Sequence, residues 1–233
     1  MLSPNAPLLL AIDTSTELAG IGLHDGARIA ECVWPAGRTQ TTSVLAEADA
    51  LLARCGRSVD DVGVVAIAIG PGTFTGLRVG LSIAKGLVLA QGVSLVGVPT
   101  LEVTAAPFVQ AGIDVLAVLP AGRGRIVRAI FSGTGAVGTL ANLAFDEFVE
   151  EAETSGMMVV GELSGEQRSV LTVRGVPLAS AAASVRRPGV LAELAMARWR
   201  MGEVDDPATL EPLYVHGVQA TTKPVVDRLR RSA

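Results

Sequence analysis

Histidine and cysteine, the residues that most often bind zinc or act as nucleophiles, are scarce in this chain. It has two of each, Cys32 and Cys55, and His24 and His216, and neither pair has the spacing of metal ligands. It also lacks the G-x-S-x-G sequence that presents a catalytic serine. The composition therefore disfavours zinc peptidases and serine hydrolases, and we interpret the two cysteines as free thiols of a cytoplasmic protein.

Long apolar runs are lacking too, although the mean hydropathy of +0.47 is high. The most apolar stretches, 62–77 and 86–101, are interrupted by glycine and proline, whereas a membrane-spanning helix needs about 20 continuous apolar residues. The first residues carry no positively charged segment like that of a signal peptide. Aromatic residues make up only 3% of the chain, so its core must be built from aliphatic side chains. We expect a protein without membrane contact.

Positive charge is not in excess either. The net charge is −4, and the one basic cluster lies at 228–231. Binding to nucleic-acid phosphates needs clustered lysine and arginine, so the chain by itself is not expected to bind nucleic acid strongly.

The first hundred residues alternate between strand-like and helical patterns. Strands are predicted at 8–12, 19–23, 29–34, 62–69 and 95–98, with helices at 42–55 and from about 74 to 91. The Asp25-Gly26 pair predicts a tight hairpin. This order predicts a mixed sheet with helices over its faces, and it resembles the ribonuclease H-like half-domain of the actin-like (ASKHA) superfamily.

From about residue 100 the pattern loosens. Helices are predicted at 101–110, 145–153 and 190–201, and strands at 115–119, 126–131, 157–160 and 170–173. We therefore expect an α/β protein of two lobes: an N-terminal ribonuclease H-like lobe, 1–102, with a mixed five-stranded sheet and helices on both faces, and a reduced C-terminal lobe, 103–233.

The turn after the first strand is a candidate phosphate site. Asp13, Thr14, Ser15 and Thr16 supply the carboxylate and hydroxyls with which actin-like proteins meet a metal and nucleotide phosphates. The same residues also make an ordinary Asx or ST turn, and that reading is preferred. An actin-like nucleotide clamp needs a second acidic-glycine turn, which the sequence after residue 100 does not contain. A competent ATPase is therefore disfavoured.

The glycine-rich stretch that opens the helix at 74–91 matches no phosphate-binding motif. Gly70 and Gly76 are too far apart for a P-loop, and Leu77-Arg78 replace its Lys-Ser/Thr pair. A tight turn remains, with Thr73 as the predicted helix N-cap.

The helix at 74–91 is apolar over most of its circumference. Gly76, Gly80 and Ala84 form one row of small residues, and a second row lies at 82, 86 and 90. Such a helix is covered either by the second lobe or by another protein, and we favour a protein interface. The predicted interface comprises Ala46, Ala50, Ala53, Gly76, Leu77, Gly80, Leu81, Ala84 and Val88. On this reading Gly80→Arg blocks dimer formation and leaves the monomer folded.

The stretch 70–81, GPGTFTGLRVGL, with AKG following at 84–86, resembles the GPGSFTGLR(I/V)GL…AKGL signature of the TsaB (YeaZ) family. Residues 9–16 are similar to the family's first-strand LAIDTS, 95–101 to its LVGVSTLE, and 212–215 to its PxYLR segment. The resemblance is strong over 8–102 and thin beyond. Gln40-Thr41 and the segment 120–127 depart from the family pattern.

The resemblance implies a degenerate actin-like paralogue of TsaD without catalytic or metal-binding residues. TsaD transfers a threonylcarbamoyl group to the adenosine 3′ of the anticodon of tRNA. Members of the TsaB family pair with TsaD through the two N-lobe helices, form homodimers through the same surface, and are joined by the ATPase TsaE. The complex uses ATP, no cofactor is held tightly by the TsaB chain, and tRNA is met only through the complex. The alternative is a stand-alone actin-like small-molecule kinase or ATPase.

Overall fold

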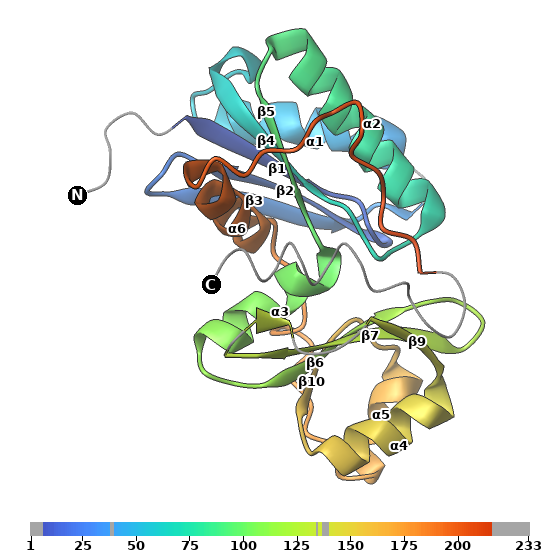
Figure 1. Cartoon of the computed structure of the whole chain (residues 1–233). Coiled ribbons are helices and arrows are strands. Elements are labelled where there is room, and N and C mark those ends of the chain that lie inside the picture. Colours follow the sequence, from blue (N-terminus) through green and yellow to red (C-terminus); the bar gives the residue numbers. More distant parts are fainter. Residues whose placement is uncertain (1–6, 38–39, 134, 137–139, 216–233) are drawn as a thin grey trace. The chain divides into compact units, whose positions relative to one another are not determined.

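The computed structural model describes residues 7–37, 40–133, 135–136 and 140–215, which form two compact units (Figure 1). Of the described residues, the first unit contains those up to Thr100 together with Arg187–Leu213, and the second contains those of Leu101–Arg186 with Tyr214 and Val215. His216 and the basic cluster 228–231 lie outside the described residues. No helix in the described ranges is long and apolar enough to cross a membrane.

The first unit is built on the mixed sheet that the sequence predicts. Its five strands lie in the order β3-β2-β1-β4-β5. Their bounds are β1 (Leu8–Asp13), β2 (Leu18–His24), β3 (Ile29–Pro35), β4 (Val62–Ala68) and β5 (Ser94–Val98). The strands β1, β2 and β3 pair antiparallel, whereas β1, β4 and β5 pair parallel. This confirms the predicted α/β, ribonuclease H-like arrangement.

Helices α1 (Gln40–Arg54) and α2 (Phe74–Gln91) cover one face of this sheet, and α6 (Pro188–Arg200) covers the other. Alternation along β2 separates the two faces. Ile21 and Leu23 join the core that α1 and α2 close. Gly20 and Gly22 face α6, where an added Cβ would lie within 3 Å of Pro188. The two glycines therefore let α6 approach the sheet closely.

The segment 187–213, which the sequence analysis assigned to the C-terminal lobe, belongs to the first unit, and the predicted division is corrected here. Glu31 on β3 holds its start, since the Glu31 carboxylate accepts from the Gly189 amide at 2.8 Å and from the Arg187 guanidinium at 2.6 Å. Further along, the Asp205 amide donates to the Leu95 carbonyl at 2.8 Å. Asp205 thereby covers part of the exposed edge of β5.

The second unit carries its own mixed sheet, with strands β10-β6-β7-β8 in order and β9 pairing with β7. The bounds are α3 (Thr100–Gln110), β6 (Val115–Pro120), β7 (Arg125–Ser132), β8 (Gly135–Ala136), β9 (Ala141–Ala144), α4 (Phe145–Ser155), β10 (Met158–Gly161) and α5 (Gly165–Val173). The strand predicted at 170–173 is wrong, because these residues are the last turn of α5. The Ser164 cap of that helix, which accepts from the Gln167 amide, outweighs the β-branched residues.

His24, at the end of β2, makes the stability of the first unit depend on pH. Its Nδ1 accepts a hydrogen bond from the Gly26 amide at 2.8 Å, so the imidazole is unprotonated at that atom. Burial lowers the pKa of His24; Arg200 acts in the same direction, and Glu193 and Asp25 oppose it. The folded state consequently takes up this proton less readily than the unfolded chain.

Stability is expected to fall as the pH drops below about 6.5, the range in which the unfolded imidazole gains a proton and the folded one resists it. His24→Asn keeps an acceptor for the Gly26 amide and removes the titration. Urea unfolding at about pH 7.5 and pH 5.5 should show a smaller loss of unfolding free energy for the variant than for wild type. An equal loss in both proteins would contradict this role of His24.

Candidate functional site

The glycine-rich loop at 70–73 packs its backbone directly on the turn at 13–16. The Thr73 amide donates to the Ser15 carbonyl at 2.7 Å. A Cβ added to Gly72 would lie 2.2 Å from the same carbonyl oxygen, so only glycine fits there without displacing one of the two segments. Thr73 also caps α2, as predicted, with its hydroxyl accepting from the Gly76 amide at 3.2 Å.

The hydroxyls proposed for phosphate binding make hydrogen bonds within the first unit. Thr14 donates from Oγ1 to the Gly76 carbonyl at 2.7 Å, and a Cβ on Gly80 would lie 2.1 Å from the same Oγ1. The Ser15 amide donates to Asp13 Oδ1 at 2.9 Å, and the Ser15 hydroxyl donates to that oxygen too. Thr16 accepts from the Leu18 amide at 3.3 Å. All four side chains of the turn are buried. These contacts favour the structural turn over the phosphate site.

Gly70 fixes the other end of the loop. It has a φ of +111°, which side-chain-bearing residues rarely adopt, and its Cβ position lies 2.7 Å from the Leu213 carbonyl. Its amide donates to Thr100 Oγ1 at 3.0 Å, and the Thr100 amide donates back to its carbonyl at 2.8 Å. The glycines of the 70–80 stretch thus serve contacts within the first unit.

The predicted interface on α2 is on the wrong side of the helix. The six α2 residues of that prediction are all buried: Gly76, Leu77, Gly80, Leu81, Ala84 and Val88. They cannot meet a partner, because they face the chain's own sheet and the 13–16 turn. The expectation that Gly80→Arg leaves the monomer folded is also corrected, since the new side chain would collide with Thr14 and Ile67.

The three α1 residues of the prediction lie on the surface. Ala46, Ala50 and Ala53 are exposed, as is the second row of small residues on α2, Ser82, Gly86 and Ala90. Helices α1 and α2 contact each other on the same face of the sheet. We call these six residues the α1–α2 outer face. The six residues are uncharged, with Asp49 on α1 and Lys85 on α2 beside them, and a Cβ added to Gly86 would meet no atom within 4 Å.

Large apolar side chains lie on the same two helices. Leu45 on α1 is 49% exposed and Leu89 on α2 is 75% exposed. Phe74, in the first turn of α2, is 54% exposed, and the Arg78 guanidinium stacks over its ring at 3.6 Å from the ring centroid. Within the described ranges, no group of three or more His, Cys, Asp or Glu side chains is arranged to hold a metal ion.

Two glycine substitutions on one helix should have opposite effects on stability. Gly80→Ala forces a methyl group against Thr14 and should lower the unfolding free energy by about 1–3 kcal/mol. Gly86→Ala adds its methyl group in open space and should raise it by about 0.5–1 kcal/mol through the better helix propensity of alanine. Chemical denaturation measures both, and equal effects would contradict the assignment of the buried and exposed faces.

Comparison with known proteins gives consistent results. The family model described as "TsaD: tRNA N6-adenosine threonylcarbamoyltransferase" matches residues 35–177, more than half of the chain. Proteins named "tRNA threonylcarbamoyladenosine biosynthesis protein TsaB" are similar over part of the chain. The one from Escherichia coli is 36% identical over 93 residues, 40% of each chain. The one from Haemophilus influenzae is 40% identical over 97 residues, 42% of this chain and 40% of its own.

These alignments span about two fifths of the length of the two relatives. The fold is similar over a longer stretch. The solved structure of YeaZ from Pseudomonas aeruginosa superposes with a TM-score of 0.74 at 22% identity, covering 90% of this chain and all of that one.

Proposed function

The chain belongs to the TsaD family and is a TsaB/YeaZ-type member of it, and on that premise we propose that it is a non-catalytic partner and activator of TsaD in tRNA threonylcarbamoyladenosine biosynthesis. In this proposal TsaD transfers the threonylcarbamoyl group to the adenosine 3′ of the anticodon. The TsaE ATPase completes the complex, which consumes the ATP and holds the tRNA.

The observation that carries the proposal is the exposure of the α1–α2 outer face. Surface helices ordinarily turn mostly charged and polar residues to water, whereas here the small, uncharged residues of the α1–α2 outer face are exposed and only Asp49 and Lys85 lie beside them. Small side chains let a second pair of helices approach closely, since interhelical distance depends on the side chains at the contact. The occupant proposed for this face is the corresponding helix pair of TsaD, with a second copy of this chain taking its place in the isolated protein.

The hydrogen bonds that the 13–16 turn makes within the first unit support a partner role over the alternative of a stand-alone kinase or ATPase. In the alternative, Thr14 and Ser15 would donate to nucleotide phosphates, but both donate to atoms of the first unit. The alternative predicts ATP turnover by the purified chain that Asp13→Ala abolishes. Such a result would overturn the proposal of a non-catalytic subunit.

The proposed face is tested by Gly86→Arg. Arginine at this exposed helical position should leave the fold intact and obstruct helix approach, so that binding to TsaD weakens by about tenfold or more. Gly165→Arg on α5 is the matched control, because Gly165 is also an exposed helical glycine with no atom within 4 Å of an added Cβ. Sedimentation of mixtures with TsaD measures the loss. Unchanged binding by the Gly86 variant would refute this placement.

The activator role is tested by threonylcarbamoylation of tRNA with TsaD and the other pathway components. Formation of the modified nucleoside should depend strongly on this protein, and Gly86→Arg should reduce the rate while Gly165→Arg does not. Full activity in the absence of the chain would overturn the proposal whatever the outcome of the binding experiment.

A further inference from the structure

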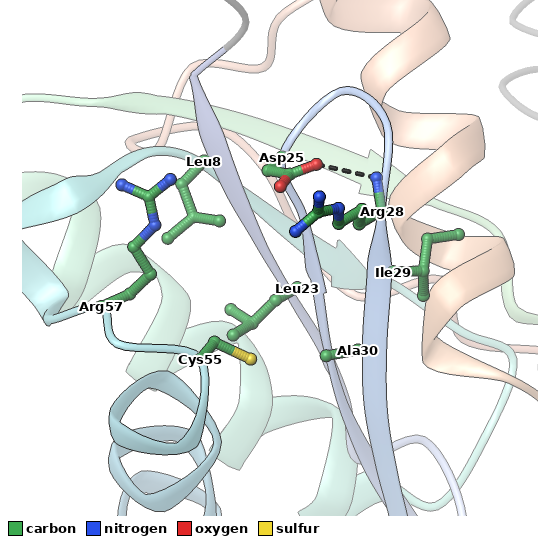
Figure 2. A pocket seen from close by; sticks show the side chains of 8 residues that line it. All are labelled: Leu8, Leu23, Asp25, Arg28, Ile29, Ala30, Cys55 and Arg57. Carbon is green, nitrogen blue, oxygen red and sulfur yellow. Dashed lines mark hydrogen bonds between the residues drawn. The ribbon is translucent and has the colours of Figure 1, made fainter.

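A second surface feature of the first unit is a cavity of about 300 Å³ at the end of the sheet distant from the 13–16 turn. It lies between the hairpin turn that joins β2 to β3 and the residues that follow α1 (Figure 2). Its apolar lining comes from the strands: Leu8 on β1, Leu23 on β2 and Ala30 on β3. Leu8 and Leu23 are buried side chains of the core, so the cavity has a fixed floor.

Two guanidinium groups stand over this floor. Arg28 comes from the hairpin and Arg57 from the segment after α1, and both line the cavity (Figure 2). Both arginines are exposed, and the charge of Arg28 acts on the neighbouring Asp25 carboxylate. Guanidinium groups are the donors that proteins use most often for carboxylate and phosphate groups, because their N–H groups can bind two oxygens at once.

The one carboxylate in the lining is already engaged. Asp25 Oδ1 accepts from the Arg28 amide at 2.7 Å and from the Ala27 amide at 3.0 Å (Figure 2). These two backbone bonds hold the pKa of the Asp25 carboxyl below its usual value, so it is ionised and fixes the turn that carries Arg28. One carboxylate against two guanidiniums leaves the cavity with net positive charge in a chain whose own net charge is −4.

We propose that this cavity binds a small organic anion, with its carboxylate or phosphate between Arg28 and Arg57 and its apolar body on Leu8, Leu23 and Ala30. The volume is at the lower end of the range for small-molecule sites, which limits the ligand to about one ring or a short chain. The apolar floor and the paired cations together distinguish such a ligand from an inorganic anion and from a neutral molecule.

Cys55 provides a direct readout, because its thiol lines the same cavity (Figure 2). N-Ethylmaleimide, which is neutral, alkylates a thiolate by addition across its double bond. Peptide mass spectrometry separates alkylation of Cys55 from that of Cys32. A ligand in the cavity should slow alkylation of Cys55 and leave Cys32, on β3 beside Glu47, unaffected.

The experiment titrates the full chain with phenyl phosphate at constant ionic strength. Phenyl phosphate should protect Cys55, whereas phenol, which lacks the anion, and inorganic phosphate, which lacks the ring, should protect about tenfold less well. Arg28→Gln and Arg57→Gln should each raise the concentration for half-protection by about tenfold. Arg54→Gln is the matched control, because Arg54 is an exposed arginine of α1 outside the lining, paired with Glu47.

Absence of protection by phenyl phosphate, or protection that survives both arginine substitutions, would overturn the proposal. If inorganic phosphate protected equally well, the proposal that the ligand is organic would be wrong. If phenol protected equally well, the proposal that the cavity binds an anion would be wrong. All of these substitutions are at exposed residues, and the experiment uses the isolated chain. Its result is therefore independent of TsaD binding and of tRNA modification.

Discussion

The close approach between the 70–80 segment and the 13–16 turn determines where the rest of the first unit lies. Backbone meets backbone at Gly72 and Ser15, and helix backbone meets a side-chain hydroxyl at Gly80 and Thr14. Neither contact has room for a single additional carbon, so α2 is held at one depth and one rotation against the ends of β1 and β4. That rotation decides which helical residues are covered by the sheet and which remain for a partner.

Small residues on α2 therefore have two different roles. The row that begins at Gly76 is small because the unit's own turn and strands lie against it. The row at 82, 86 and 90 is exposed, and a Cβ added to Gly86 would meet no atom within 4 Å, so close intramolecular packing does not explain why Gly86 is small. A docking surface explains it, and this is the physical reason for the proposal that TsaD binds the α1–α2 outer face. In the same arrangement the hydroxyls of Thr14 and Ser15 donate hydrogen bonds within the first unit. These hydroxyls are therefore not available as donors to a phosphate.

Much of the fold could be predicted from the sequence, because the first-unit strands carry strong periodic signals and Thr73 an unambiguous cap. The buried face of α2 could not, since both rows of small residues satisfy the same helical pattern and only the three-dimensional contact at Gly80 distinguishes them. Local propensity also misassigned 170–173, where the helix cap at Ser164, six residues before the start of that stretch, overrode the β-branched residues. The return of α6 to the first unit was missed because long-range packing, here Pro188 against Gly20 and Gly22, leaves no local signal.

The return of α6 makes the first unit discontinuous in the sequence, and this has a consequence for synthesis. All five strands of its sheet have left the ribosome before α6 is translated, and the whole of Leu101–Arg186 comes between. During that interval the sheet has α1 and α2 on one face and no α6 on the other. The glycines of β2 leave a shallow strip on this face, which stays uncovered in the nascent chain until Pro188 is synthesised and packs against Gly20 and Gly22.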